Sequence, residues 1–317
     1  MKLLLTGTTG FIGRHLLQVI DNIGTETVVL GRNRPENYDG EFILYDLNDS
    51  ADADLRLQGV DVVIHIAARA HIMNDAALDP LAEYRALNTE ATLKLAKNAF
   101  ESGVKRFIFV SSIKVNGDST SDGHIFKYSD THHFNDYYGQ SKSEAEILLK
   151  NFADMTGLQI VIIRPTLVYG PGVKANFAAL MNLVSKGVPL PFGCITQNRR
   201  SLVSVTNIVD LIITCIDHPK AANQVFLVSD DHDVSTSEMV RQMAKALGKP
   251  SMQVPIPIWC YKFAAKIFNK SDMVDRLIGS LQVDISHTKE TLGWRPPQTL
   301  KEGFKQAAQA FLQTKTK

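Results

Sequence analysis

A glycine-rich turn near the N-terminus constrains the fold of this chain most strongly. An apolar run over residues 2–6 leads into the sequence TGTTGFIG at 6–13, and apolar residues with helical spacing follow it. A strand that ends in glycines and opens a helix is typical of a dinucleotide cradle, in which free N–H groups and the positive end of the helix face a pyrophosphate. A plain tight turn is the alternative. The residues expected at the cofactor from this turn are Gly7, Thr9, Gly10, Phe11, Ile12 and Gly13.

Apolar runs and helical segments alternate along the first half of the chain. The runs are continuous rather than alternating in hydrophobicity, which is typical of parallel strands covered on both faces. The sequence therefore predicts an α/β fold with a Rossmann-type, doubly wound parallel sheet. We expect strands over 2–6, 25–30, 42–45, 60–67, 106–111 and 158–164, and helices over 13–23, 79–102 and 138–156.

The pattern changes after Val168, where glycine and proline punctuate shorter segments. Strands are expected over 202–205 and 225–228, and the second is expected to rejoin the main sheet. The remainder predicts a smaller α/β substrate-binding lobe. We place the Rossmann domain at 1–167 plus about 204–228, and the lobe at 168–203 and 229–317.

Composition excludes several classes of protein. The net charge of +1 provides no general attraction to nucleic acid or to an anionic membrane, and the three cysteines form no Cys-x-x-Cys motif. We therefore expect a cytoplasmic protein with no nucleic-acid partner, no membrane partner and no metal. The His132–His133 pair lacks a third ligand at suitable spacing, and the acidic run 230–233 is interpreted as a solvated loop.

Tyr138 and Lys142 are the candidate acid/base pair. They are four residues apart on an expected helix, so their side chains point the same way. A nearby ammonium favours the phenolate and lowers the pKa of a tyrosine, which can then exchange a proton with a carbonyl or alcohol oxygen. Ser112 follows the strand expected at 106–110, at the sheet edge where ligands bind, and could bond the same oxygen. The predicted catalytic set is Ser112, Tyr138 and Lys142.

The end of the second expected strand bears on the choice of cofactor. A dinucleotide site usually carries an acidic residue there for the ribose 2′-hydroxyl, but the sequence at 30–34 is LGRNR. Arg32 and Arg34 can grip a 2′-phosphate, so NADP is predicted, with NAD as the alternative. Asp46 and Leu47 end the third strand and could receive the adenine, although a simple loop aspartate is an equal interpretation.

Together these features make the chain resemble the extended short-chain dehydrogenase/reductase family, most of all its nucleotide-sugar epimerases and 4-keto-sugar reductases. The landmarks run through almost the whole chain: 6–13, Asp46-Leu47, 65–68, Leu87-Asn88, Ser111-Ser112, 138–142, Arg164-Pro165, 169–172, 200–205 and 292–296.

The resemblance implies further site residues. Ala67 and Ala68 would lie at the cofactor, and Asn88 would hold the kink or water beside the catalytic lysine. Arg200 would bind the substrate diphosphate, which suits a planar guanidinium. Asn176 and Arg276 are further substrate-binding candidates. The family likeness also implies a homodimer paired through the helices at 79–102 and 138–156.

Departures from the family pattern bear on the reaction. Dehydratases of this group carry an Asp-Glu pair where this chain has Ile113 and Lys114, so dehydration is not expected. With NADP expected as a consumed cofactor, the sequence predicts a reductase that acts on the 4-keto group of a nucleotide-linked, UDP-type deoxy-hexulose. The alternative is an NAD-dependent 4-epimerase of UDP-glucose or UDP-N-acetylglucosamine. A non-catalytic NADP-sensing module is the alternative from another class.

Overall fold

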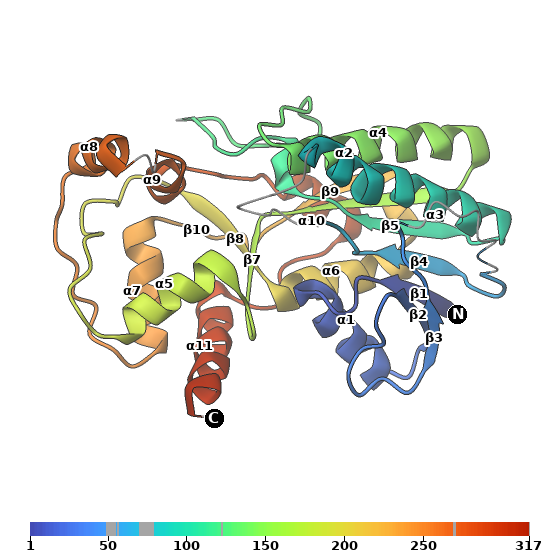
Figure 1. Cartoon of the computed structure of the whole chain (residues 1–317), viewed down its shortest axis with the longest axis horizontal. Coiled ribbons are helices and arrows are strands. Elements are labelled where there is room, and N and C mark those ends of the chain that lie inside the picture. The colour runs from blue at the N-terminus through green and yellow to red at the C-terminus, as the bar shows by residue number, and fades with distance from the viewer. Residues whose placement is uncertain (49–54, 56, 70–78, 122, 269–270, 317) are drawn as a thin grey trace.

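A seven-stranded parallel sheet forms the centre of the molecule (Figure 1). The computed structural model describes residues 1–48, 55, 57–69, 79–121, 123–268 and 271–316. The strand order is β3-β2-β1-β4-β5-β6-β9, so the winding reverses between β1 and β4. This confirms the expected α/β class and the return of the late strand to the sheet. The strands are β1 Lys2–Thr6, β2 Glu26–Gly31, β3 Glu41–Leu44, β4 Val62–His65, β5 Arg106–Val110, β6 Gln159–Pro165 and β9 Gln224–Val228.

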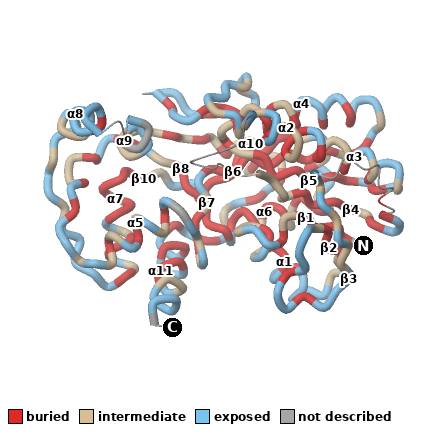
Figure 2. The backbone as a smooth tube through the Cα atoms, in the orientation of Figure 1, coloured by how far each residue is buried: buried red, intermediate tan, exposed pale blue. Residues whose placement is uncertain are grey.

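Helices cover both faces of this sheet, which explains the continuous apolar runs. Along β1, Leu3 and Leu5 pack into one buried core and Leu4 packs into the other. The first core lies under α1 (Phe11–Asn22) and α6 (Val205–Asp217). The second lies under α3 (Ala91–Glu101) and α4 (Tyr137–Thr156), on the opposite face (Figure 1). Figure 2 shows the buried strands between these two layers of helices.

The helix expected over 79–102 is interrupted. It consists of α2 (Pro80–Arg85), a π-helical turn η1 (Ala86–Glu90) and α3. Asn88 in this turn accepts a hydrogen bond from the Arg69 N–H at 2.8 Å and donates to the Ser141 hydroxyl at 3.0 Å. The wider turn thus places a buried amide against α4, and π turns of this kind frequently occur at functional sites.

A buried histidine joins β1, β4 and α3. His65 Nδ1 lies 2.7 Å from the Thr6 hydroxyl, and Nε2 lies 3.0 Å from the Thr92 hydroxyl. Thr92 already donates its own proton to the Asn88 carbonyl at 2.9 Å, so Nε2 must be the donor and Nδ1 the acceptor. Burial accordingly lowers the pKa of His65 to about 3, and the imidazole is neutral.

A second, smaller mixed sheet consists of β10 (Asp233–Val234), β8 (Arg200–Ser204) and β7 (Leu167–Tyr169). A third core forms there. In the described ranges no helix has both the length and the apolar character needed to cross a bilayer. The other elements are η2 Ile113–Val115, η3 Pro219–Ala221, α5 Ala175–Ser185, α7 Thr236–Ala246, α8 Ile258–Phe268, α9 Ser271–Ile278, α10 Ser286–Leu292 and α11 Leu300–Thr316.

The acidic run after β9 is a solvated loop only in part, because Asp231 and His232 are exposed but Asp230 is not. Asp230 is buried and accepts hydrogen bonds from the Tyr169 hydroxyl at 2.7 Å, the Ser204 N–H at 2.8 Å and the Asn207 amide at 2.7 Å. Burial raises the pKa of Asp230, and these donors act in the opposite direction. The carboxylate therefore joins β7, the start of α6 and the end of β9.

Candidate active site

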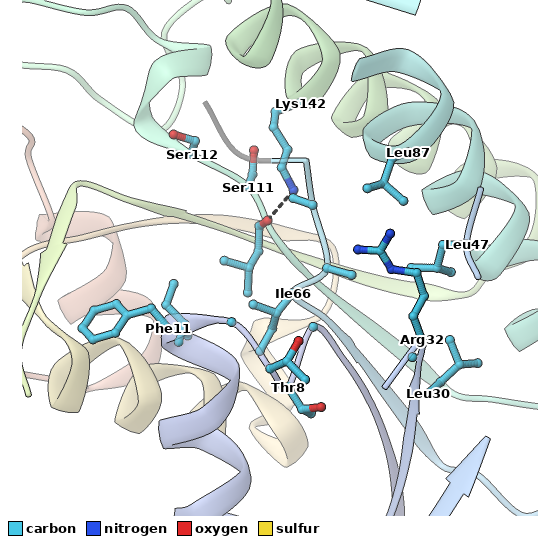
Figure 3. A pocket seen from close by; sticks show the side chains of 18 of the residues that line it. Thr8, Phe11, Leu30, Arg32, Leu47, Ile66, Leu87, Ser111, Ser112 and Lys142 are labelled. Carbon is cyan, nitrogen blue, oxygen red and sulfur yellow. Dashed lines mark hydrogen bonds between the residues drawn. The ribbon is translucent and has the colours of Figure 1, made fainter. Parts of the chain in front are cut away.

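A pocket of about 470 Å³ opens at the carboxyl ends of the main strands (Figure 3). This is the sheet edge where ligands bind in open α/β folds, next to the reversal between β1 and β4. Arg32 lies on one side of the pocket, and Ser112 and Lys142 lie on the other. The predicted site residues among its lining are Gly7, Thr9, Gly10, Phe11, Ile12, Arg32, Asp46, Leu47, Ala67, Ala68, Ser112, Tyr138 and Lys142.

The glycine turn has the geometry of a phosphate cradle. Gly7 has φ +73°, and a Cβ there would lie 2.5 Å from the backbone nitrogen of Ala67. A Cβ on Gly13 would lie 2.2 Å from the Gly7 carbonyl oxygen, so Gly13 serves close packing of α1 on the turn rather than lining the pocket. Gly10 is the N-cap of α1 and has no side chain to occupy the first N–H groups, which remain open to an anion.

Of the two arginines after β2, the structure brings one to the pocket. Arg34 is outside the lining and donates to the backbone carbonyls of Tyr38 at 3.1 Å and Gly40 at 3.0 Å. Its guanidinium also lies 5.2 Å from the centre of the Phe42 ring. The guanidinium is thus engaged with its own loop, and the predicted two-arginine grip on a 2′-phosphate is not assembled.

Helix α4 carries the predicted catalytic pair into the pocket. Asp136 is its N-cap and accepts the Gly139 N–H at 2.7 Å. Lys142 is fully buried and donates to the Val110 carbonyl at 2.9 Å, with Nζ 4.3 Å from the centre of the Phe109 ring (Figure 3). Burial lowers the pKa of Lys142 to about 7, and the Glu146 carboxylate opposes this shift.

Tyr138 lies against Ser112, as the sequence predicted. Burial raises the pKa of Tyr138 to about 12, while a hydrogen bond with Ser112 acts to lower it. The expectation that Lys142 lowers the pKa of this phenol is not met, because desolvation dominates and the amine is bonded to Val110. Tyr138 is therefore protonated at neutral pH in this geometry. The neighbouring Tyr137 is 50% exposed and lies outside the pocket lining.

A buried ion pair fixes the residues behind this site. Glu146 accepts hydrogen bonds from the Ser111 hydroxyl at 2.5 Å and from Arg164 Nε at 2.9 Å and Nη2 at 2.5 Å. Arg164 also donates to the Asn116 side chain at 2.9 Å and to Nε2 of His132 at 2.7 Å. Because Ser111 precedes Ser112 and Glu146 lies one turn after Lys142, the pair holds β5 and α4 in register at the catalytic residues.

The sequence contained a signal for this pair that we did not use. Arg164 is a charged residue in an otherwise apolar, buried strand, and charged residues in such positions are almost always paired. Likewise His132, which we interpreted as part of a polar loop, is bonded to Arg164 and to the Ser143 hydroxyl at 2.6 Å.

Of the predicted substrate residues, Ser112 lines the pocket, and Arg200, Arg276 and Asn176 lie outside the lining. Arg200 donates to the carbonyls of Arg276 at 2.8 Å and Gly279 at 3.2 Å, so Arg200 and Arg276 are brought together across β8 and α9. Burial and the charge of Arg276 lower the pKa of Arg200. Asn176 is exposed on the first turn of α5. Asn88 is also outside the lining, but it holds the π turn against α4 between Tyr138 and Lys142.

Sequence reasoning missed part of the pocket wall. The missed residues share one property, since most stand at or directly after the carboxyl ends of strands. Extending the strand-end rule to every strand would have found most of them. They are Thr8, Leu30, Gly31, Asn33, Tyr45, Asn48, Ile66, Leu87, Val110, Ser111, Pro165, Thr166 and Val168.

Comparison with known proteins agrees with the dinucleotide cradle seen in the structure. Residues 3–229 match the NAD dependent epimerase/dehydratase family. The chain belongs to this family. It is 61% identical over 315 residues to a UDP-glucose 4-epimerase of Vibrio cholerae, covering 98% of this chain and 96% of that protein. It is an enzyme of the extended short-chain dehydrogenase/reductase type, as the resemblance implied.

Solved structures share the fold. A UDP-glucose 4-epimerase of Thermotoga maritima with UDP-glucose superposes with a TM-score of 0.79 at 22% identity, covering 99% of both chains. A UDP-glucose 4-epimerase of Thermus thermophilus in complex with NAD gives a TM-score of 0.76 at 21% identity, covering 98% of this chain and 99% of the other.

The predicted 4-keto-sugar reductase is wrong. The high identity to a protein named as a 4-epimerase, over almost the full length of both chains, overturns it. The reductase prediction depended on the arginines after β2, and one of them is bound within its own loop. The Ser112, Tyr138 and Lys142 set cannot distinguish the two reactions, because both need a proton exchanged at a sugar oxygen beside a nicotinamide.

Proposed function

We propose that this enzyme is an NAD-dependent UDP-glucose 4-epimerase. The observation that carries the proposal is the identity of 61% to the Vibrio cholerae enzyme, over 98% of a chain whose Tyr138 and Lys142 enter the same pocket as the glycine turn. A nucleotide sugar is therefore the proposed substrate. The non-catalytic sensor is set aside, because the catalytic set and the cradle are intact.

NAD, rather than NADP, is the proposed cofactor. It is supported by the family and by the engagement of Arg34 with carbonyl groups of its own loop. Bound NAD would supply a hydride acceptor and donor. The glycine turn with Gly7 and Gly10 would hold its pyrophosphate, and Arg32, Asp46 and Leu47 would surround its adenosine half.

The chemistry assigned to the chain is proton exchange at one oxygen. Inverting C4 without breaking the C–O bond requires removal of the C4 hydrogen and its return to the opposite face, so the C4 oxygen must lose a proton and then regain it. A tyrosine can accept a proton only as the phenolate, so Tyr138 in that form would take this proton and then return it, and Ser112 would bond the same oxygen. Lys142 would favour the phenolate when charged, and Asn88 would fix the helix position of both.

The substrate and the assembly extend the same proposal. We place the nucleotide in the lobe formed by 168–203 and 229–317, with Arg200, Arg276 and Asn176 as its binding residues. A homodimer through α3 and α4 is supported by outward apolar side chains at Phe100, Ile147, Leu148 and Met155. The free state of all three cysteines is consistent with a cytoplasmic location.

Isotope retention tests the reaction. The purified enzyme with NAD is incubated with UDP-glucose carrying deuterium at C4, and the products are resolved by NMR and mass spectrometry. We expect UDP-galactose at many turnovers per enzyme, with deuterium retained at C4 and no accumulation of NADH. Tyr138→Phe should lower kcat by at least about 100-fold, in the range for loss of a general acid or base, with NAD affinity unchanged.

Two results would contradict the proposal. Loss of the C4 deuterium to solvent would show that the hydrogen leaves as a proton, so hydride return would be excluded. If no UDP-galactose forms but another nucleotide sugar in a substrate panel is turned over, the family chemistry would hold and UDP-glucose would be excluded as the substrate. Arg32→Ala gives a matched test of the cofactor, since the NADP assignment predicts that it selectively weakens NADP.

A further inference from the structure

Helix α8 turns its apolar side outward. Trp259 is 69% exposed, Phe263 62% and Ile267 60%, whereas the small side chain of Ala265 is the buried residue assigned to this helix. In contrast, α1, of similar length, buries Leu16, Leu17 and Ile20 in the sheet core. A short helix is stabilised in a protein mainly by covering its apolar face. The outward face of α8 therefore needs an apolar cover.

The charged residues on α8 indicate which kind of partner covers its apolar face. Trp259, Phe263 and Ile267 are four residues apart and form one stripe along the helix. Lys262 and Lys266 are both exposed and border this stripe on one side, and the helix sequence IWCYKFAAKIF contains no acidic residue. An aromatic and aliphatic stripe bordered by lysines is the pattern of a helix that lies in a bilayer interface, where lysines meet anionic headgroups.

A second copy of the chain fits α8 less well. The cores of protein–protein interfaces are depleted in lysine, and here two lysines adjoin the stripe. The apolar surface on α3 and α4, which suits dimer pairing, lies at the other end of the long axis of the molecule (Figure 1). The end with α3 and α4 is thus available for pairing with a second copy, and the end with α8 is available for a lipid surface.

We propose that α8 docks this enzyme on an anionic lipid surface as a peripheral, interfacial helix. Trp259, Phe263 and Ile267 enter the boundary between headgroups and acyl chains, and Lys262 and Lys266 bind the lipid phosphates. Helix α9 packs against α8, and its Arg276 carbonyl holds Arg200. Docking therefore places the proposed substrate lobe at the membrane. This departs from the sequence expectation of no membrane partner and does not depend on the sugar specificity.

Vesicle flotation of the full-length protein tests the proposal. Vesicles of phosphatidylcholine alone are compared with vesicles that also contain phosphatidylglycerol, at low and high salt. We expect binding to the anionic vesicles that weakens with salt. Replacing Lys262 and Lys266 together with glutamine should weaken that binding roughly 30-fold, from about 1 kcal/mol for each lysine near the surface. Replacing Phe263 and Ile267 with glutamine should abolish flotation with the anionic vesicles.

Matched variants separate docking from general stickiness. Lys301 and Lys305 are exposed and four apart on α11, so their double glutamine variant should bind as wild type. Leu44→Gln removes a 74% exposed leucine from β3 and should also bind as wild type. Brominated lipid should quench the fluorescence of Trp259. Trp294 is only 6% exposed, so the quenching can be assigned to Trp259.

Three outcomes would overturn the proposal. The first is no flotation of the wild-type protein. The second is flotation unchanged by the α8 substitutions. The third is a change in oligomeric state, rather than in lipid binding, when Phe263 and Ile267 are replaced, which would assign α8 to a protein interface. Turnover of UDP-glucose in solution is measured in parallel, so a failure of lipid binding is distinguishable from a failure of the proposed reaction.

Discussion

At the scale of single residues, Lys142 couples catalysis to stability. Its amine is fully buried and its folded-state pKa is about 7, against a usual value of 10.5. The unfolded chain thus binds more protons than the folded chain between these values, and stability rises with pH across that window. Below about pH 7 the lysine is charged in both states. Burying the charge then lowers the free energy of unfolding by its maximum amount, roughly 5 kcal/mol at 1.36 kcal/mol for each pKa unit.

Lys142→Met should therefore stabilise the protein while removing activity. The gain in the free energy of unfolding should be largest near about pH 6 and should shrink steadily toward about pH 10, because the wild-type penalty disappears there. Urea unfolding across this range measures it. Lys301→Met, at an exposed site, is the control and should show no such trend. A pH-independent difference between Lys142→Met and wild type would contradict the low folded-state pKa.

At the scale of elements, the start of α4 decides where the reacting phenol lies. Asp136 caps this helix through the Gly139 N–H and also binds the Lys114 ammonium, which Asp118 contacts at 2.8 Å. Tyr138 is the second residue of the helix, so fraying of the first turn displaces its hydroxyl from Ser112. We therefore expect the cap to act as a positioning group for Tyr138.

Two substitutions at Asp136 distinguish the cap from the ion pair. Asp136→Ala should lower the free energy of unfolding by about 1 kcal/mol, the usual loss for a helix cap, and should lower kcat several-fold. Asp136→Ser keeps a capping oxygen but loses the charge, and should retain most of both quantities. Urea unfolding and initial rates measure them. Equal damage from both variants would assign the effect to the Lys114 ion pair instead.

At the scale of the whole molecule, the outer surface of α3 and α4 governs assembly. Ile147 is 48% exposed, Met155 77% and Phe100 41%, although all three stand on helices whose other faces are buried. Replacing Ile147 and Met155 with lysine should convert the proposed dimer into a monomer, because like charges would face each other across a two-fold interface. Light scattering after size-exclusion chromatography measures the mass, and Leu44→Lys is the control for surface charge.

Much of the fold follows from local sequence patterns. The strand before Gly7 and the continuous apolar runs are signals within one segment, and they predict the sheet and its helices. Helical spacing continues through 79–102 and does not predict the break at Asn88; only the family resemblance implied a kink there. The π turn is held by Ser141, more than 50 residues away. The predicted role of Arg34 at a 2′-phosphate was wrong for a similar reason, since backbone carbonyls compete for its guanidinium. The prediction of the reaction was wrong because the same proton exchange serves both reduction and epimerisation.

The anchoring of α4 determines which partner moves during turnover. Tyr138 and Lys142 stand on a helix that is tied to β5 by Lys142, to β6 by Glu146 and to the π turn by Ser141. A proton acceptor mounted this rigidly cannot travel from one side of a sugar ring to the other. In the proposed epimerase, the sugar ring would therefore have to turn between the two half-reactions while the nucleotide stays bound. For such an enzyme we expect specificity to depend on the space that the cavity leaves for the hexose to turn, so that larger ring substituents would be excluded sterically.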